Sequence, residues 1–162
     1  MNQSQLILPE FDDEMRRTRV ILEHVPADKL DWKLSDDFKT IGWNANHLAD
    51  CISWTPVILQ ESEFDIHPPG QPPHDTPDLK DVAAIISSFD SAVSAARELI
   101  LQTTDETFAE PWTMKMQGQI LFTTPKYYSF RTWIMNHSIH HRGILSVYLR
   151  MAGVKLTPVY DG

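Results

Sequence analysis

The sequence predicts an all-α protein in which a single domain forms a four-helix bundle. Its 162 residues have the usual length of one domain, enough to bury about two-thirds of the surface of the unfolded chain. Four long segments carry apolar residues at helical spacing, and a bundle buries one apolar face on each of four helices. Because no internal repeat or low-complexity tract divides residues 1–162, we expect one domain.

The first two predicted helices lie in the N-terminal third. The first begins near Leu6 and ends at Pro26, which cannot continue a helix. The second begins after Thr40, a suitable N-cap, and Pro56 either kinks it or ends it early. The apolar face of the first holds Phe11, Met15, Thr18, Leu22 and Val25, and the inward face of the second holds Asn44, His47, Leu48, Cys51, Trp54 or Thr55, and Ile58.

The other two helices follow a proline-rich loop at residues 62–78. Thr76-Pro77 and Thr124-Pro125 both resemble an N-cap followed by the first helical residue. Between them, Met114–Gln117 and Gln119–Phe122 flank Gly118 and predict a small hairpin. The third helix has an apolar face of Val82, Ile86, Phe89, Val93, Ala96 and Ile100, and the fourth, which runs to about Met151, has an inward face of Phe130, Ile134, His137, His141, Leu145 and Tyr148.

The composition excludes several classes of protein. The formal net charge is -8, and without a run of lysine or arginine such a chain is repelled by phosphate backbones, so we expect no nucleic-acid partner. Neither a signal peptide nor an apolar run of 18 residues is present, so we expect no membrane association. The single cysteine, Cys51, fits a reducing compartment, which makes the cytoplasm the expected location.

Three histidines suggest a metal site. His137 and His141 are four residues apart, so they lie one turn apart on the same face of a helix, and His47 is on the inward face of another. Buried imidazoles need partners for both ring nitrogens, and three protonated rings would repel one another. A divalent cation removes both difficulties, because each neutral ring donates a lone pair to it. The residues therefore predict a metal ion held in the core of the bundle.

Two alternatives remain open from the residues alone. His140 is also a helical neighbour of His137, although the alignment of His141 with Ile134 and Leu145 favours His141. The pair could also be half-buried core histidines that bind no metal, since a chain with seven histidines often contains this spacing by chance. The other histidines are expected at the surface: His24, His67 and His74.

Two motifs resemble signatures of the DinB/YfiT-like metalloprotein superfamily. Thr40–Trp43 followed by Asn46–Leu48 resembles the family's second-helix signature, and Asn136–Gly143 resembles its fourth-helix signature. The segments Tyr148–Arg150 and Thr157–Gly162 resemble the family's usual ending. The resemblance therefore covers nearly the whole chain, and its fourth-helix motif is the more specific one.

The resemblance implies a four-helix bundle in up-down-down-up order, with His47, His137 and His141 as ligands of one divalent ion and water in the open positions. Zinc or nickel is the expected ion, with iron or manganese as alternatives, and a homodimer is the expected assembly. Characterised relatives include thiol S-transferases and mycothiol-dependent maleylpyruvate isomerases, so a small-molecule thiol or electrophile is the expected partner. However, Ile144 stands where the family often has glutamine, so the substrate of a relative is not carried over.

Asp50, Trp54 and Tyr148 are candidates for the surroundings of the metal. Asp50 follows His47 by three residues and either orients a histidine ring or is a solvated carboxylate, which is the more common state of an aspartate. Of the aromatic residues, most of which we expect in the core, Trp54 and Tyr148 are the candidates to line a pocket above the metal.

Cys51 and Arg142 also lie close to the predicted ligands in sequence. Cys51 is one turn after His47 and is either a thiolate ligand or, as we favour, an inert buried thiol. Arg142 points away from His141 by about 100° around the helix, which favours a structural or dimer-contact role. Gly143 within the helix indicates the close approach of another helix.

Two functions are consistent with these residues. Three neutral ligands leave the ion its full charge and open positions, so a metal-bound water or thiolate would be the nucleophile. The sequence thus predicts a metal-dependent hydrolase or low-molecular-weight thiol S-transferase. The alternative is a non-catalytic, metal-stabilised binding or stress-response protein. A fourth protein ligand would favour this alternative, whereas an open position beside a cleft would favour the enzyme.

Overall fold

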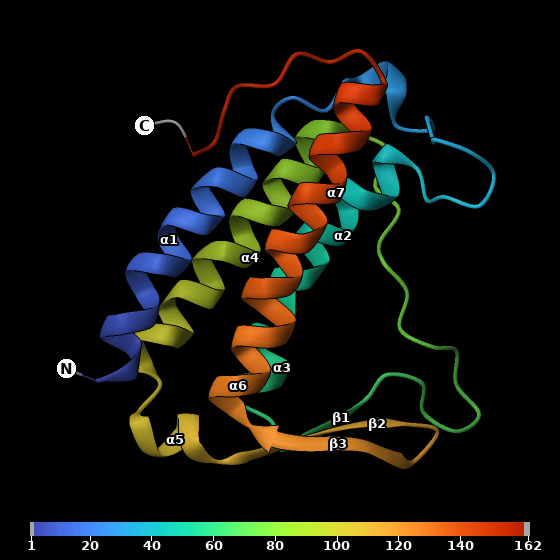
Figure 1. Ribbon diagram of the computed structural model, residues 1–162. Coiled ribbons are helices and arrows are strands. Elements are labelled where there is room, and N and C mark those ends of the chain that lie inside the picture. Colours follow the sequence, from blue (N-terminus) through green and yellow to red (C-terminus); the bar gives the residue numbers. More distant parts are fainter. Residues whose placement is uncertain (1, 161–162) are drawn as a thin grey trace.

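The structure, a computed structural model that describes residues 2–160, is mostly helical (Figure 1). The four longest helices are α1 (Gln3–Leu22), α2 (Ile41–Ser53), α4 (Val82–Gln102) and α7 (His137–Met151). The shorter helical elements are η1 (Ala27–Lys29), α3 (Thr55–Leu59), α5 (Asp105–Ala109), α6 (Lys126–Phe130) and the π-helical η2 (Arg131–Asn136). The strands are β1 (Glu63–Asp65), β2 (Pro111–Met116) and β3 (Gln119–Pro125).

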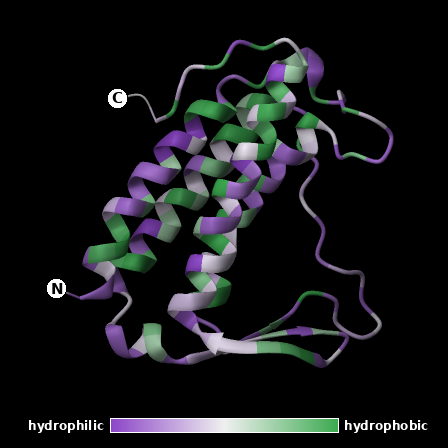
Figure 2. Cartoon of the chain, viewed as in Figure 1, coloured by the Kyte–Doolittle hydropathy of each residue, from purple (hydrophilic) through white to green (hydrophobic). Residues whose placement is uncertain are grey.

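The long helices bury a shared apolar core. Helices α1 and α2 each pack against both α4 and α7, so the four form a closed ring of contacts around the core. Both hydrophobic and hydrophilic residues occur on each long helix in Figure 2, as expected for helices with one buried and one exposed face. The largest fully buried side chains include Phe11, Phe89, Phe108, Trp112 and Phe130.

Polar side chains fix the starts of α1 and α2. Asn2 and Gln5 form a reciprocal capping box in which each side chain accepts a hydrogen bond from the other residue's backbone N–H. The Thr40 hydroxyl accepts from the Trp43 backbone N–H, which confirms the predicted N-cap. Gly42 packs tightly beside the preceding turn, because a Cβ there would lie 2.9 Å from the Leu30 carbonyl oxygen.

The second helix ends earlier than the longer of the two predicted possibilities. Helix α2 stops at Ser53, and Pro56 lies in the first turn of the separate helix α3, where its missing N–H costs nothing. The fourth helix begins at Lys126 rather than at Pro125, because Thr124 and Pro125 still belong to β3. It then passes through the π-helical η2 before α7 begins at His137.

The prediction that Thr76-Pro77 starts the third helix is wrong. Helix α4 starts at Val82 with Asp81 as its N-cap. The reason is tertiary: the side chain of Asn46 on α2 bonds both the N–H and the carbonyl of Leu79, which holds this stretch outside a helix. The proline-rich loop, predicted at residues 62–78, therefore has different bounds in the structure, because residues 63–65 form β1 and the loop ends only at α4. From here on the name refers to residues 66–81, which run along the outside of the helices from the sheet to α4 (Figure 1).

A small three-stranded sheet corrects the all-α prediction. The predicted hairpin is confirmed as β2 and β3, which pair antiparallel with slightly longer bounds. Gln117 and Gly118 at its turn both have positive φ, as a tight two-residue turn requires. Strand β1, which was not predicted, pairs parallel to β2 in the order β1-β2-β3. The sheet lies at the end of the helices where α5 and α6 are found (Figure 1). Within residues 2–160, no helix is long and apolar enough to cross a membrane.

Candidate metal centre

The three predicted ligand histidines converge. His47 comes from α2, while His137 and His141 come from successive turns of α7, and these two helices pack against each other. One ring nitrogen from each histidine lies within 4.8 Å of those of the other two. The Nε2 atoms of His47 and His137 are 3.2 Å apart. Two nitrogens that bind one zinc ion at about 2.0–2.1 Å in a tetrahedral arrangement would be about 3.3 Å apart, so this spacing fits an ion.

Burial keeps these imidazoles neutral. Burial and the neighbouring His137 lower the pKa of His47 to about 4. Burial, helped by the adjacent histidines, lowers the pKa of His141 to about 3, and burial with repulsion from His140 lowers the pKa of His137. At neutral pH all three rings therefore hold an unprotonated nitrogen, which is the form that binds a metal.

The contacts of the rings support the same interpretation. The Nδ1 of His47 lies 3.0 Å from the Thr76 hydroxyl, which leaves Nε2 facing the other histidines. The Nδ1 of His141 is buried, and no hydrogen-bond partner reaches it within the described part of the chain. An unpaired buried polar atom is costly, and a cation inside the cluster would give the ring a partner. His140 is exposed, as the helical alignment indicated.

Neither possible fourth ligand belongs to this cluster. Asp50 is buried, against our expectation of a solvated carboxylate, because it pairs with Nε2 of His74 at 2.9 Å. That pairing also places His74, which we expected at the open surface, beside the site. Cys51 is buried as predicted, and burial raises the pKa of its thiol to about 12. Among residues 2–160, the group with metal-binding geometry contains the three histidines and no other side chain.

A pocket of about 350 Å³ opens beside the histidines. This volume falls within the range of small-molecule sites, about 300–1,000 Å³. Trp54 lines it, whereas Tyr148 lies elsewhere and packs edge-on against Trp32 and Phe38. The lining residues are Trp43, His47, Asp50, Cys51, Trp54, Ile66, His74, Asp75, Thr76, Met114, Leu121, Phe122, Trp133 and His137. The contributions of the proline-rich loop and the sheet had no signal in the sequence, because both reach the site through tertiary contacts.

Arg142 and Ile144 serve packing. Arg142 is buried beside Glu14 and Thr18 of α1, with Arg142 Nη2 2.6 Å from a Glu14 carboxylate oxygen. Ile144 is partly buried and packs against the hydrophobic core. At Gly143 a Cβ would have no neighbour within 4 Å, so the close helix approach expected there is absent between the described residues. His24 and His67 lie outside the pocket lining.

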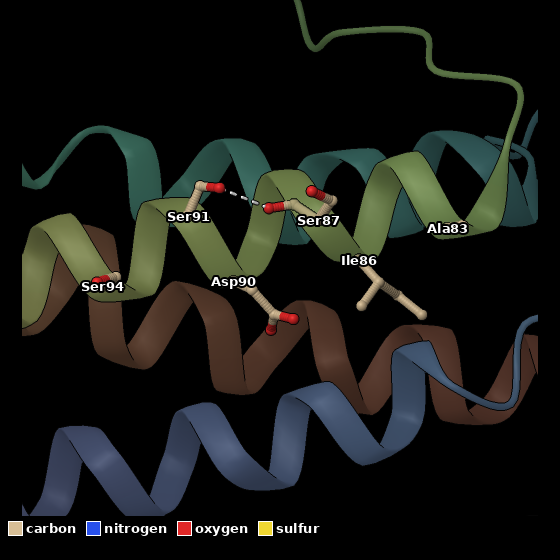
Figure 3. A pocket seen from close by; sticks show the side chains of 6 residues that line it. All are labelled: Ala83, Ile86, Ser87, Asp90, Ser91 and Ser94. Atoms are coloured by element: carbon tan, nitrogen blue, oxygen red, sulfur yellow. Dashed lines mark hydrogen bonds between the residues drawn. The ribbon is translucent and has the colours of Figure 1, made fainter.

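A second hollow lies on the exposed face of α4 and shares no lining residue with this pocket (Figure 3). It is lined by Ala83, Ile86, Ser87, Asp90, Ser91 and Ser94, all from one helix, and its serine hydroxyls include Ser91, which donates to the Ser87 carbonyl at 2.8 Å. A hollow bounded by a single helix is open to solvent on its other sides. It contains none of the side chains of the candidate metal centre.

Comparisons with known proteins agree with the arrangement of helices. A sequence model described as the DinB family matches residues 1–162. The fold is similar to a DinB-like protein of Bacillus cereus ATCC 10987, with a TM-score of 0.71, 23% identity, and coverage of 94% of this chain and 95% of that one. It is also similar to a DinB-like protein of Bacillus subtilis, with a TM-score of 0.70, 16% identity, and coverage of 94% and 96%. No curated protein sequence matches the chain.

Proposed function

The chain belongs to the DinB family, and we propose that it binds one divalent metal ion through His47, His137 and His141 and acts as a metal-dependent enzyme. The proposed reaction is a hydrolysis or the transfer of a low-molecular-weight thiol. Zinc or nickel is the proposed ion, with iron or manganese as alternatives. The observation that carries the proposal is the convergence of three histidines beside a pocket.

The chemistry of the donor set fits this role. When bound, a divalent ion with three neutral ligands lowers the pKa of a water or thiol at its open position. The chain's own residues hold the three rings unprotonated by burial and orient His47 through the Thr76 hydroxyl. The pocket beside the cluster gives a small molecule room to approach it.

The surroundings of the cluster support an enzyme over the alternative, a non-catalytic metal-stabilised binding or stress-response protein. Structural zinc sites are usually closed by a fourth protein ligand. Here Asp50 is paired with His74, and among residues 2–160 neither Asp50 nor Cys51 belongs to the group of side chains with metal-binding geometry. A small-molecule thiol or electrophile therefore remains the proposed partner in the adjoining pocket.

Elemental analysis of untagged protein tests the metal. We expect about one ion per chain in the unmodified protein and in His140→Ala, whose exposed ring is the matched control, and far less in His137→Ala. Metal well below one ion per chain that does not increase on reloading would contradict the site.

Turnover tests the catalytic part. The rate of conjugation of a low-molecular-weight thiol to an electrophile, and of ester hydrolysis, is compared between metal-loaded protein and His137→Ala. We expect the rate to fall to background in the variant. Equal rates in the two proteins would exclude a metal-dependent enzyme for these reactions and favour the non-catalytic alternative.

Family membership is also the basis for proposing the finer architecture and the assembly. The ring of contacts that α1 and α2 make with α4 and α7 supports a single-domain four-helix bundle in up-down-down-up order. We propose a homodimer located in the cytoplasm, and sedimentation analysis at micromolar concentration tests the dimer.

A further inference from the structure

Asp50 and His74 form a second polar group in the pocket, separate from the three histidines. Asp50 lies on α2, and its side chain is only 7% exposed. His74 belongs to the proline-rich loop, and its Nε2 lies 2.9 Å from the Asp50 carboxylate. A buried carboxylate needs such a partner, because an unpaired one would be strongly destabilising. The pair therefore holds the imidazole of His74 in a defined orientation.

The backbone around His74 is fixed as well. Its N–H donates to the Ile66 carbonyl at 2.8 Å, and further along the loop Leu79 is bound by the side chain of Asn46. The ring of Trp54 meets the His74 ring edge to face, with centroids 4.8 Å apart. The His74 ring is thus held by its backbone, its Asp50 partner and an aromatic neighbour.

One nitrogen of this ring remains available. Because Nε2 faces the Asp50 carboxylate and donates its hydrogen there, Nδ1 is the ring nitrogen left outside this pair, and in the neutral form of the ring it carries the lone pair. Within residues 2–160 no hydrogen bond to Nδ1 of His74 is formed. A carboxylate behind one nitrogen makes the other a better acceptor, as in the orienting pairs of many enzymes. Because His74 also lines the pocket, Nδ1 is the candidate acceptor for a ligand's proton.

Aromatic rings form the walls of the pocket. Trp54 and His74 line one part of it, and the rings of Phe122 and Trp133, which are stacked with centroids 5.7 Å apart, line another. The apolar side chains of Ile66, Met114 and Leu121 also line it. Such a lining favours planar apolar molecules, because aromatic rings stack on one another or meet edge to face.

The charges of the residues that line the pocket favour a neutral ligand. Among the residues that line the pocket there are two carboxylates, Asp50 and Asp75, and no lysine or arginine. A ligand with several carboxylate or phosphate groups would therefore meet no cationic side chain here. A neutral aromatic molecule needs no cationic partner and is not repelled by the two carboxylates.

We propose that this pocket binds a neutral planar aromatic molecule with one hydrogen-bond donor, such as a phenol, whose donor is accepted by Nδ1 of His74. The aromatic body lies against Trp54 and Trp133. That such molecules are the substrate class of the enzyme rests on the proposed function. Their binding needs only the side chains of the pocket.

Three naphthalene probes test the proposal on the 162-residue chain as purified, by equilibrium dialysis at pH 7. The probes are 2-naphthol, 2-methoxynaphthalene, in which the donor is capped, and 2-naphthoate, which is an anion. One hydrogen bond to the ligand is worth about a factor of ten in affinity, so 2-naphthol is expected to bind about tenfold more tightly than 2-methoxynaphthalene. After removal of metal with a chelator, 2-naphthoate is expected to bind most weakly.

Variants assign the effect to His74. His74→Phe keeps an aromatic wall without the acceptor and is expected to bind the two neutral probes equally. His67→Phe, a change on the same loop outside the pocket, is expected to keep the tenfold preference. Trp54→Leu is expected to weaken both neutral probes alike. Equal binding of the two neutral probes to the unmodified protein, or a tenfold preference kept in His74→Phe, would overturn the proposal.

If His74→Phe does not fold, NMR of the unmodified protein tests the same contact. In the unmodified protein labelled with ¹⁵N, addition of 2-naphthol is expected to shift the side-chain Nδ1 resonance of His74, and an unchanged resonance at saturation would refute the contact. Failure of the proposed function is recognised separately, by the absence of metal in elemental analysis. Binding of the probes to metal-free protein does not depend on that result.

Discussion

Replacing Arg142 with methionine tests whether the arginine beside the candidate ligand His141 acts in stability or in chemistry. Its guanidinium is buried against α1, where it forms an ion pair with Glu14 and donates to the Glu14 carbonyl at 3.0 Å and to the Thr18 hydroxyl at 3.3 Å. Methionine keeps the length and the apolar stem of the side chain but removes the charge and every donor.

The size of the effect follows from what the change leaves behind. Removing one partner of a buried ion pair costs about 3–5 kcal/mol, because the other charge remains buried. Glu14 keeps a second partner, since Arg17 lies 2.7 Å from its other carboxylate oxygen. We therefore expect the lower end of the range, a loss of about 3 kcal/mol in the free energy of unfolding for Arg142→Met.

Urea unfolding of metal-loaded protein measures this loss. The matched control is Arg150→Met, an exposed position on the same helix, where a change within about 0.5 kcal/mol is expected. The double variant Arg142→Met/Glu14→Gln removes both charges and is expected to recover most of the lost stability. Metal content per folded chain should not change. A loss below about 1 kcal/mol together with loss of metal would refute the structural role and place Arg142 in the metal site.

Two glycines on candidate-site helices have opposite expectations. Gly143→Ala adds a methyl group in open space and should raise the free energy of unfolding by about 1 kcal/mol. Gly42→Ala should lower the free energy of unfolding, because the added Cβ would contact the preceding turn. Urea unfolding measures both changes, and a destabilised Gly143→Ala would show that another surface covers α7. In metal-free protein, the pKa values of His47 and His141 are lowered, so only the unfolded state takes up protons as the pH falls from about 6.5 to about 4. The free energy of unfolding should therefore be greatest above pH 6.5. It should fall across that range by roughly 1–2 kcal/mol per histidine, after allowance for partial exposure. A constant urea midpoint over that range would contradict this. The thiol of Cys51 should react with a disulfide reagent far more slowly in native protein than in urea-unfolded protein, because it is buried and its pKa is raised to about 12. Equal labelling rates in the two states would disprove its inertness.

Local patterns in the sequence were enough for the helices and for the spacing of the histidines. Helical periodicity brings His137 and His141 to one face because residues four apart always do so on a helix, and the Thr40 N-cap is an interaction within one turn. The hairpin was predictable for the same reason, since Gly118 marks a turn between adjacent strands. Each of these features depends on residues close together in the chain.

What the sequence could not provide were contacts between distant segments. An aspartate such as Asp50 is usually exposed to solvent, so nothing in the sequence around it predicts burial. Only the folded proline-rich loop brings His74, 24 residues away, to its carboxylate. Helix α4 starts at Val82, later than predicted, because Asn46 binds the backbone of Leu79. Strand β1 depends in the same way on a distant segment, since it pairs with β2.

Helical periodicity in the amino-acid sequence therefore predicts which side chains share a helix face, including His137 and His141, because the geometry of a helix repeats at fixed intervals along the chain. The tertiary structure decided that His47 meets them, that the Asp50–His74 pair and the aromatic walls adjoin them, and that Tyr148 does not. Those outcomes depend on how helices and loops pack, and packing is a property of surfaces that lie far apart in the sequence.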